Sequence, residues 1–191
     1  IMLLIVVGGI GFLTWDDVCE NKWRLHRYRM QSKVILVTTG LLILLPAVFF
    51  FFTDFSALST GKRLLASFFQ SVTPRTAGYN TVTLSAMSGA SQGIMILLML
   101  IGGSPGSTAG GIKTTTAATL FLSTRAIVKN KNHLVVFRKN IPHQTVTKAL
   151  AITMVSISFL LLAAFSLYQA EGGSMVDVVY ETTSAIGTVG L

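Results

Sequence analysis

Two long, largely apolar stretches of the chain contain no charged residue. Residues 34–53 and 149–170 are free of Asp, Glu, Lys and Arg. A helix rises about 1.5 Å per residue, so each stretch is long enough to cross the roughly 30 Å hydrocarbon core of a bilayer. The pattern predicts an all-α membrane protein with one transmembrane helix through each stretch.

The polar breaks after these stretches recur with the same spacing. Sliding the second half of the chain back by 112 positions places Thr188 on Thr76 and Gly190 on Gly78. In each copy the long span is followed by a short amphipathic stretch and then by a Thr-small-Gly segment. We therefore predict two copies of one unit, each a transmembrane helix, a re-entrant pore helix and a filter loop.

The uncharged run 76–112 is too long for a single span. It contains a segment rich in glycine with one proline, and both residue types disfavour a continuous helix. We predict a broken helix with an outer half at 94–101, an inner half at 114–128 and an intramembrane loop between them. The loop residues expected to act as a gate are Gly102, Gly103, Ser104, Pro105, Gly106, Ser107, Thr108, Ala109, Gly110, Gly111 and Lys113.

Composition agrees with a membrane protein, and charge predicts its orientation. Hydrophobic residues make up 51% of the chain and charged residues only 12%, against about 25% charged in soluble domains. Of the 15 Lys and Arg residues, five lie in residues 16–33 and six in 125–148, so the positive-inside rule places both loops in the cytoplasm. These loops account for the net charge of +8, and without a nucleic-acid-binding motif we expect no nucleic-acid partner.

The amphipathic stretch between the two spans must then enter the membrane from the outer side and return to it. Non-helical backbone at membrane depth is tolerated only where it is buried in protein or lines a water-filled path. The residues expected to form an ion filter are Thr76, Ala77, Gly78 and Tyr79 in the first copy and Thr188, Val189 and Gly190 in the second. Glycine can turn its carbonyl toward a dehydrated cation without a Cβ clash. A single such segment is more simply interpreted as a turn, but its repetition favours a filter.

Two sequence segments together resemble the Trk/Ktr/HKT superfamily of potassium transporters. They are TPRTAGYNT at residues 73–81 and GGSPGSTAGGIKTTT at residues 102–116, and the Ktr B-subunit branch is the closest match. Members of that superfamily have four fused units around one pore, each contributing one filter glycine. The resemblance implies that this chain is a fragment.

The resemblance divides the chain as follows. Residues 1–15 would be the end of the second unit's last helix, and residues 16–33 a cytoplasmic loop. Residues 34–128 would be the third unit, with a span at 34–53, a pore helix at 61–73, a filter at 74–80 and a broken span at 83–128. Residues 129–146 would be a second cytoplasmic loop, and residues 147–191 would begin the fourth unit, with a span at 147–170, a pore helix at 173–184 and a filter at 185–191.

The same resemblance implies a function. It implies a multi-pass plasma-membrane protein, not an enzyme, that takes up potassium and holds the ion only through filter carbonyls, with sodium transport or coupling left open. It also implies a homodimer and a cytosolic ring of regulatory subunits, which alone would bind a nucleotide. The loop of residues 102–113, which would lie below the third filter, resembles the gate of that family. The basic stretch 125–148 would face the ring, although charges that only set topology explain it equally well.

Two cationic side chains near the expected pathway carry hypotheses. The Lys113 ammonium would oppose cation passage, and the alternative is a lysine that extends to the membrane surface. Arg75, beside the first filter, would repel the ion unless a carboxylate or carbonyls held it aside. Glu181, at the end of the second pore helix, is a candidate partner.

Two soluble-enzyme motifs match only in part. Residues 106–114 have one residue too many for a GxxxxGK[ST] loop and follow a membrane helix instead of a strand. Residues 102–106 satisfy GxSxG, but His26, His133 and His143 lie in the basic loops and have no metal-ligand spacing. The remaining alternatives are an unregulated cation channel and a secondary transporter of another solute, because such transporters also use broken helices.

Overall fold

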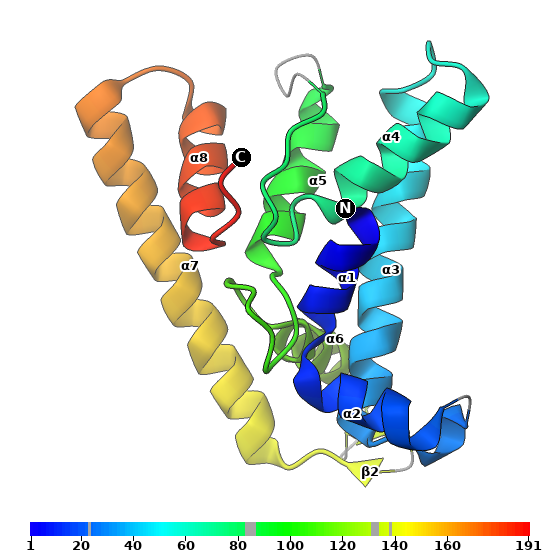
Figure 1. Ribbon diagram of the computed structural model, residues 1–191. Helices are drawn as coiled ribbons and strands as arrows, with labels where there is room; N and C mark the ends of the chain where they lie inside the picture. The colour runs from blue at the N-terminus through cyan, green and yellow to red at the C-terminus, as the bar shows by residue number, and fades with distance from the viewer. Residues whose placement is uncertain (23, 83–86, 131–133, 138) are drawn as a thin grey trace.

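The chain is almost entirely helical (Figure 1). The computed structural model describes residues 1–191 except 23, 83–86, 131–133 and 138. Its elements are α1 (Met2–Ile10), α2 (Phe12–Asn21), the short 3₁₀ helix η1 (Leu25–Arg27), α3 (Met30–Thr53), α4 (Thr60–Val72), α5 (Gly89–Leu100), α6 (Thr114–Val128), β1 (Val135–Val136), β2 (Lys139–Asn140), α7 (His143–Glu171) and α8 (Met175–Ile186). The two strands form one small antiparallel pair.

Two described helices, α3 and α7, are each long and apolar enough to cross a membrane. They contain the charge-free stretches from which spans are predicted, and each begins a few residues earlier than predicted. The side of α7 that no other described element covers is strongly apolar, with Val155 69% and Leu162 67% exposed. Such a surface suits a lipid environment. The predicted all-α membrane fold is therefore confirmed.

Shorter helices pack against each of these two spans. α4 packs along α3, and α8 packs between α7 and α5 (Figure 1). A buried cluster that includes Phe50, Met95 and Leu98 joins α3 to α5, and Tyr180 of α8 packs against it. The predicted broken span begins at residues 83–86, which lie outside the described residues; the observed helix α5 begins at Gly89 and is separated from α6 by the loop.

The first apolar run bends sharply, although the sequence predicts one helix end over residues 1–15. α1 and α2 meet at Gly11 at an angle of 94°. Gly11 has φ 88° and ψ 147°, a conformation that only glycine adopts readily. The indole N–H of Trp15 donates to the carbonyl of Val7 (2.8 Å) across the bend. As a result α2 crosses the lower end of the molecule (Figure 1).

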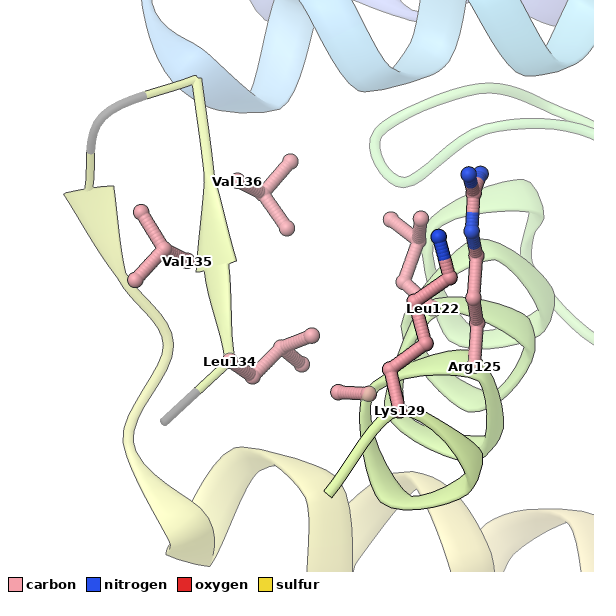
Figure 2. Close-up of a pocket in the computed structure, with 7 residues that line it drawn as sticks. Leu122, Arg125, Lys129, Leu134, Val135 and Val136 are labelled. Atoms are coloured by element: carbon pink, nitrogen blue, oxygen red, sulfur yellow. The ribbon is translucent and has the colours of Figure 1, made fainter. Parts of the chain in front are cut away.

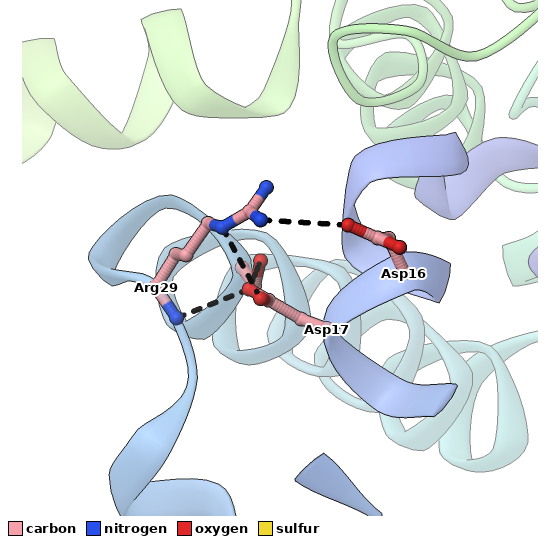
Figure 3. A network of polar contacts seen from close by, with 4 residues as sticks. Asp16, Asp17 and Arg29 are labelled. Carbon is pink, nitrogen blue, oxygen red and sulfur yellow. Dashed lines mark hydrogen bonds and ion pairs between the residues drawn. The ribbon is translucent and has the colours of Figure 1, made fainter. Parts of the chain in front are cut away.

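A buried carboxylate fixes α2 to the start of α3 (Figure 3). Asp17 is 2% exposed, and its Oδ2 accepts hydrogen bonds from the backbone N–H of Arg29 (3.0 Å) and the hydroxyl of Ser32. The Arg29 side chain forms ion pairs with both Asp17 (3.4 Å) and Asp16 (3.4 Å). Because a buried charge needs such partners, α2 is held firmly against α3.

A second carboxylate, Asp54, joins the end of α3 to the start of α5. It accepts hydrogen bonds from the backbone N–H of Ser88 (2.8 Å) and the hydroxyl of Ser91. Burial alone would raise the pKa of Asp54, but these hydrogen bonds outweigh it and hold the pKa below its ordinary value of 3.8. The link therefore stabilises the fold above pH 3.8 and weakens as pH falls through the lower pKa of the folded state.

We expect Asp54→Asn to lower the melting temperature at pH 7, because a neutral amide accepts the hydrogen bonds of Ser88 and Ser91 less strongly than a carboxylate does, a loss of about 1 kcal/mol. The difference from the unmutated protein should shrink as pH falls toward the acid range. Thermal unfolding in detergent at a series of pH values measures both effects. Glu20→Gln, which neutralises an exposed carboxylate, is the control. Equal melting temperatures at pH 7 would contradict the assigned role of Asp54.

Candidate filter and intramembrane loop

The two candidate filter segments share one backbone pattern. Thr76 and Gly78 have φ of 61° and 65°, and Thr188 and Gly190 have φ of 54° and 81°. Threonine is β-branched and rarely adopts this left-handed conformation. Alternation of left-handed and ordinary residues turns successive carbonyls toward one side, which is the arrangement that a row of cation-binding carbonyls requires.

Side chains near the ends of α4 and α8 hold each segment in place. The hydroxyl of Thr73 donates to the carbonyl of Tyr79 (2.6 Å). In the second copy the hydroxyl of Ser184 accepts hydrogen bonds from the backbone N–H groups of Gly190 (3.1 Å) and Leu191 (2.8 Å). We did not predict either anchor. The available signal was a hydroxyl residue near the end of each amphipathic stretch.

The two segments lie against each other at Gly78. A Cβ on this glycine would collide with the carbonyl oxygen of Val189 and would lie 3.1 Å from that of Gly190. A Cβ on Gly190 would meet no described atom within 4 Å. Gly78 is thus required both for its conformation and for the close approach, whereas Gly190 is required for its conformation alone.

The loop between α5 and α6 is closed at its base by backbone hydrogen bonds. Gly102 N–H donates to the carbonyl of Ile112 (3.0 Å), and Thr114 N–H donates to that of Gly103 (3.1 Å). The fully buried hydroxyls of Ser104 and Thr114 are 3.0 Å apart. The segment therefore leaves and rejoins the helical path at nearly the same place.

The C-terminal part of the loop contacts the second candidate filter segment. The N–H of Gly110 donates to the hydroxyl oxygen of Thr188 (3.2 Å), and a Cβ on Gly110 would collide with that threonine side chain. In Figure 1 the loop lies directly below the end of α8. A cavity of about 350 Å³ separates it from the first filter segment, and its lining includes Thr76, Tyr79 and Thr108.

Comparison with known proteins assigns the family. The family described as "TrkH: Cation transport protein" matches residues 1–191. The chain belongs to the TrkH family. The predicted superfamily is thereby confirmed, and the family consists of membrane transport proteins and not of enzymes, as predicted.

TrkH-family relatives cover nearly the whole chain. It is 41% identical over 196 residues to "Ktr system potassium uptake protein B" of Vibrio alginolyticus, covering 98% of this chain and 43% of that protein. It is 36% identical over 197 residues to the protein of the same name from Bacillus subtilis, covering 100% of this chain and 44% of that protein. It is 37% identical over 197 residues to "Potassium/sodium uptake protein NtpJ" of Enterococcus hirae, covering 98% and 44%. The chain thus spans less than half the length of these relatives.

A solved structure has the same fold. The potassium transporter TrkH from Vibrio parahaemolyticus matches with a TM-score of 0.80 over 99% of this chain and 42% of that one, at 16% sequence identity. The likeness places the observed helices in the TrkH fold.

The structure shows the contacts of Lys113 and Arg75, the two cationic side chains near the expected ion pathway of this TrkH-family chain. The ammonium of Lys113 donates a hydrogen bond to the carbonyl of Ala109, so it ties the loop to itself. Arg75 is only 4% exposed, and its Nη2 makes one long contact of 3.5 Å with the hydroxyl of Thr39. Among the described residues Arg75 forms no ion pair with Glu181, which is exposed. The suggested pairing is therefore absent from this part of the molecule.

The second basic loop forms a pocket of about 260 Å³ beside the end of α6 (Figure 2). Arg125 and Lys129 extend in the same direction from α6, opposite Leu134 and Val136 of the small hairpin. His133 lies outside the described residues. In the part of the chain that the structure describes, no three His, Cys, Asp or Glu residues are grouped so that they could hold a metal ion.

Proposed function

We propose that the full-length protein takes up potassium across the plasma membrane through a pore whose third and fourth filter segments lie in this chain. The observation that carries the proposal is the matched backbone of two segments, left-handed at Thr76 and Gly78 and again at Thr188 and Gly190, in direct contact at Gly78. The names of the relatives, two potassium uptake proteins and one potassium/sodium uptake protein, favour potassium and leave sodium open.

The proposed filter acts through the backbone. Carbonyls of Thr76, Ala77, Gly78 and Tyr79, together with those of Thr188, Val189 and Gly190, would replace the hydration shell of the ion. α4 and α8 both end directly before a filter segment, and the partial negative charge at a helix C-terminus stabilises a cation. No cofactor is needed for this role.

We propose that the loop of residues 102–113 is the gate. Its residue Gly110 is hydrogen-bonded to Thr188, so in this position the loop lies across the inner end of the second filter segment. Opening would require the loop to withdraw from that threonine. The base of the loop is closed by its own hydrogen bonds, so it can stay in place while the rest of the loop moves.

The partners belong to the same proposal. A homodimer and a cytosolic nucleotide-binding ring of regulatory subunits would complete the transporter. The pocket beside Arg125 and Lys129 offers two parallel cationic side chains to an acidic surface of such a ring. Exchanging both for glutamine should weaken binding of the ring and leave regulator-free transport unchanged.

Growth of a potassium-uptake-deficient strain tests the main proposal. The full-length gene should restore growth at low potassium, and Gly78→Ser should not. A full-length protein that reaches the membrane without restoring growth or potassium flux would overturn the assignment of potassium as substrate.

We expect Thr188→Val to raise flux in the absence of regulatory subunits. Valine keeps the shape of threonine but cannot accept the hydrogen bond from Gly110 N–H, so the loop is held less firmly. The loss of one net hydrogen bond is about 1 kcal/mol, which corresponds to a several-fold rise. Thr76→Val is the matched control in the other filter segment, and vesicle flux is the measurement. An equal change in both variants would attribute the effect to the filter instead of the loop.

A further inference from the structure

The bend between α1 and α2 contacts the loop through its backbone. A helix leaves the N–H groups of its first turn and the carbonyls of its last turn without partners inside the helix. At this bend both kinds of group face the loop. Ser104 N–H donates to the carbonyl of Gly9 (2.9 Å), and Phe12 N–H donates to the carbonyl of Gly106 (3.2 Å).

Gly11 allows this approach. A Cβ at Gly11 would lie 2.5 Å from the carbonyl oxygen of Pro105, closer than side chains tolerate. The residue is buried, and its positive φ already excludes most other residues. The loop therefore meets three consecutive parts of the bend: the end of α1, the turn at Gly11 and the start of α2.

The bend is itself held by a buried carboxylate. Asp17, six residues beyond Gly11 along α2, is buried against the start of α3 through Arg29 and Ser32. The loop is thus connected to the α1–α2 bend through two backbone hydrogen bonds, one with α1 and one with α2, and the bend is connected through Asp17 to a transmembrane span. These contacts are separate from the bonds that close the loop upon itself and from its contact with Thr188.

We infer that the α1–α2 bend is the holding site of the gating loop, with Gly11 and Phe12 as positioning residues. The inference rests on the proposed function, in which the loop is the gate. The bend retains the loop beneath the filter while the pore is closed. A displacement of the loop away from the bend breaks the Gly9 and Phe12 contacts together and opens the pore.

Phe12→Pro removes the holding donor with little other change. Phe12 is the first residue of α2, where proline is well tolerated, and ψ 147° at Gly11 lies in the range that a following proline permits. The phenyl ring is 76% exposed, so its packing contribution is small. Phe12→Ala is the matched control, because it loses the same ring and keeps the N–H.

Flux of thallium or rubidium into vesicles containing the full-length protein, without regulatory subunits, is the readout. We expect flux through Phe12→Pro to rise about fivefold, the effect of one net hydrogen bond on an equilibrium, with the ratio of potassium to sodium flux unchanged. Phe12→Ala should behave like the unmutated protein. A flux rise with lost selectivity would indicate a damaged filter and would overturn the inference.

Gly11→Ala supplies a second test through steric displacement of Pro105. Its control is Gly8→Ala, because a Cβ at Gly8 meets no described atom within 4 Å. If Phe12→Pro and Gly11→Ala both elute as folded protein and pass no more ions than their controls, the bend does not hold the loop. In that case a loop-shortened protein that still leaks preserves the gate, whereas one that does not leak overturns the gate as well.

Discussion

Gly78→Ala in the full-length protein is expected to abolish potassium uptake while the protein still reaches the membrane. Two effects combine at this position. The left-handed conformation, with φ 65°, costs a residue with a side chain about 1–2 kcal/mol. The new Cβ would also collide with the carbonyl oxygen of Val189, a backbone atom that cannot rotate away. Relief of the collision must separate the two filter segments, so the carbonyls lose their common axis.

Rubidium uptake and growth at low potassium measure this effect, and other glycines of the chain provide graded controls. Gly93→Ala, in helix α5, places its Cβ where no described atom lies within 4 Å, and alanine favours a helix by about 1 kcal/mol. This variant should transport normally. Gly190→Ala meets no atom but keeps the strain of φ 81°, so its loss should be intermediate. Normal uptake by Gly78→Ala would refute the proposed filter.

The spans and the family could be predicted because their signals are local. Lipid excludes charge over the whole length of a span, so α3 and α7 can be read from two uninterrupted runs. Repetition of a Thr-x-Gly segment at constant spacing indicated a duplicated unit, and the family and fold are now shown. The ion-binding role of Gly78 and Gly190 remains a prediction that the matched backbone angles support.

The contacts that position the loop could not be predicted, because they depend on tertiary structure. Gly8, Gly9 and Gly11 look alike in the sequence, and only the structure, through the positive φ of Gly11 and the approach of Pro105, distinguishes Gly11 as the place of the bend. The bond from Gly110 to Thr188 joins residues 78 positions apart. Nothing in the pattern around either residue indicates the other.

Shortening the loop is expected to produce the largest rise in regulator-free flux. Replacing residues 105–111 with two glycines should leave the base intact, because Gly102 and Gly103 pair directly with Ile112 and Thr114. It removes Gly110, which is bonded to Thr188, together with Pro105 and Gly106, which contact Gly11 and Phe12 at the bend, and it keeps the bond from Ser104 N–H to the carbonyl of Gly9. Flux should therefore exceed that of Thr188→Val or Phe12→Pro, each of which removes one contact. Thr108→Ala, an exposed position within a loop of full length, is the control.

The loop could obstruct the pore by the positive charge of Lys113 or by its bulk. Comparing the flux of the shortened protein with that of Lys113→Ala separates these two possibilities. If the ammonium repels the ion, Lys113→Ala should raise flux about as much as shortening the loop. In the structure the ammonium instead donates to the carbonyl of Ala109, which neutralises part of its field and stiffens the loop. We therefore expect Lys113→Ala to raise flux only slightly, and to the same extent at low and high ionic strength.

A large rise that falls with added salt would favour electrostatic repulsion, because salt screens charge but not bulk. Unchanged flux after shortening would contradict both forms of the gate.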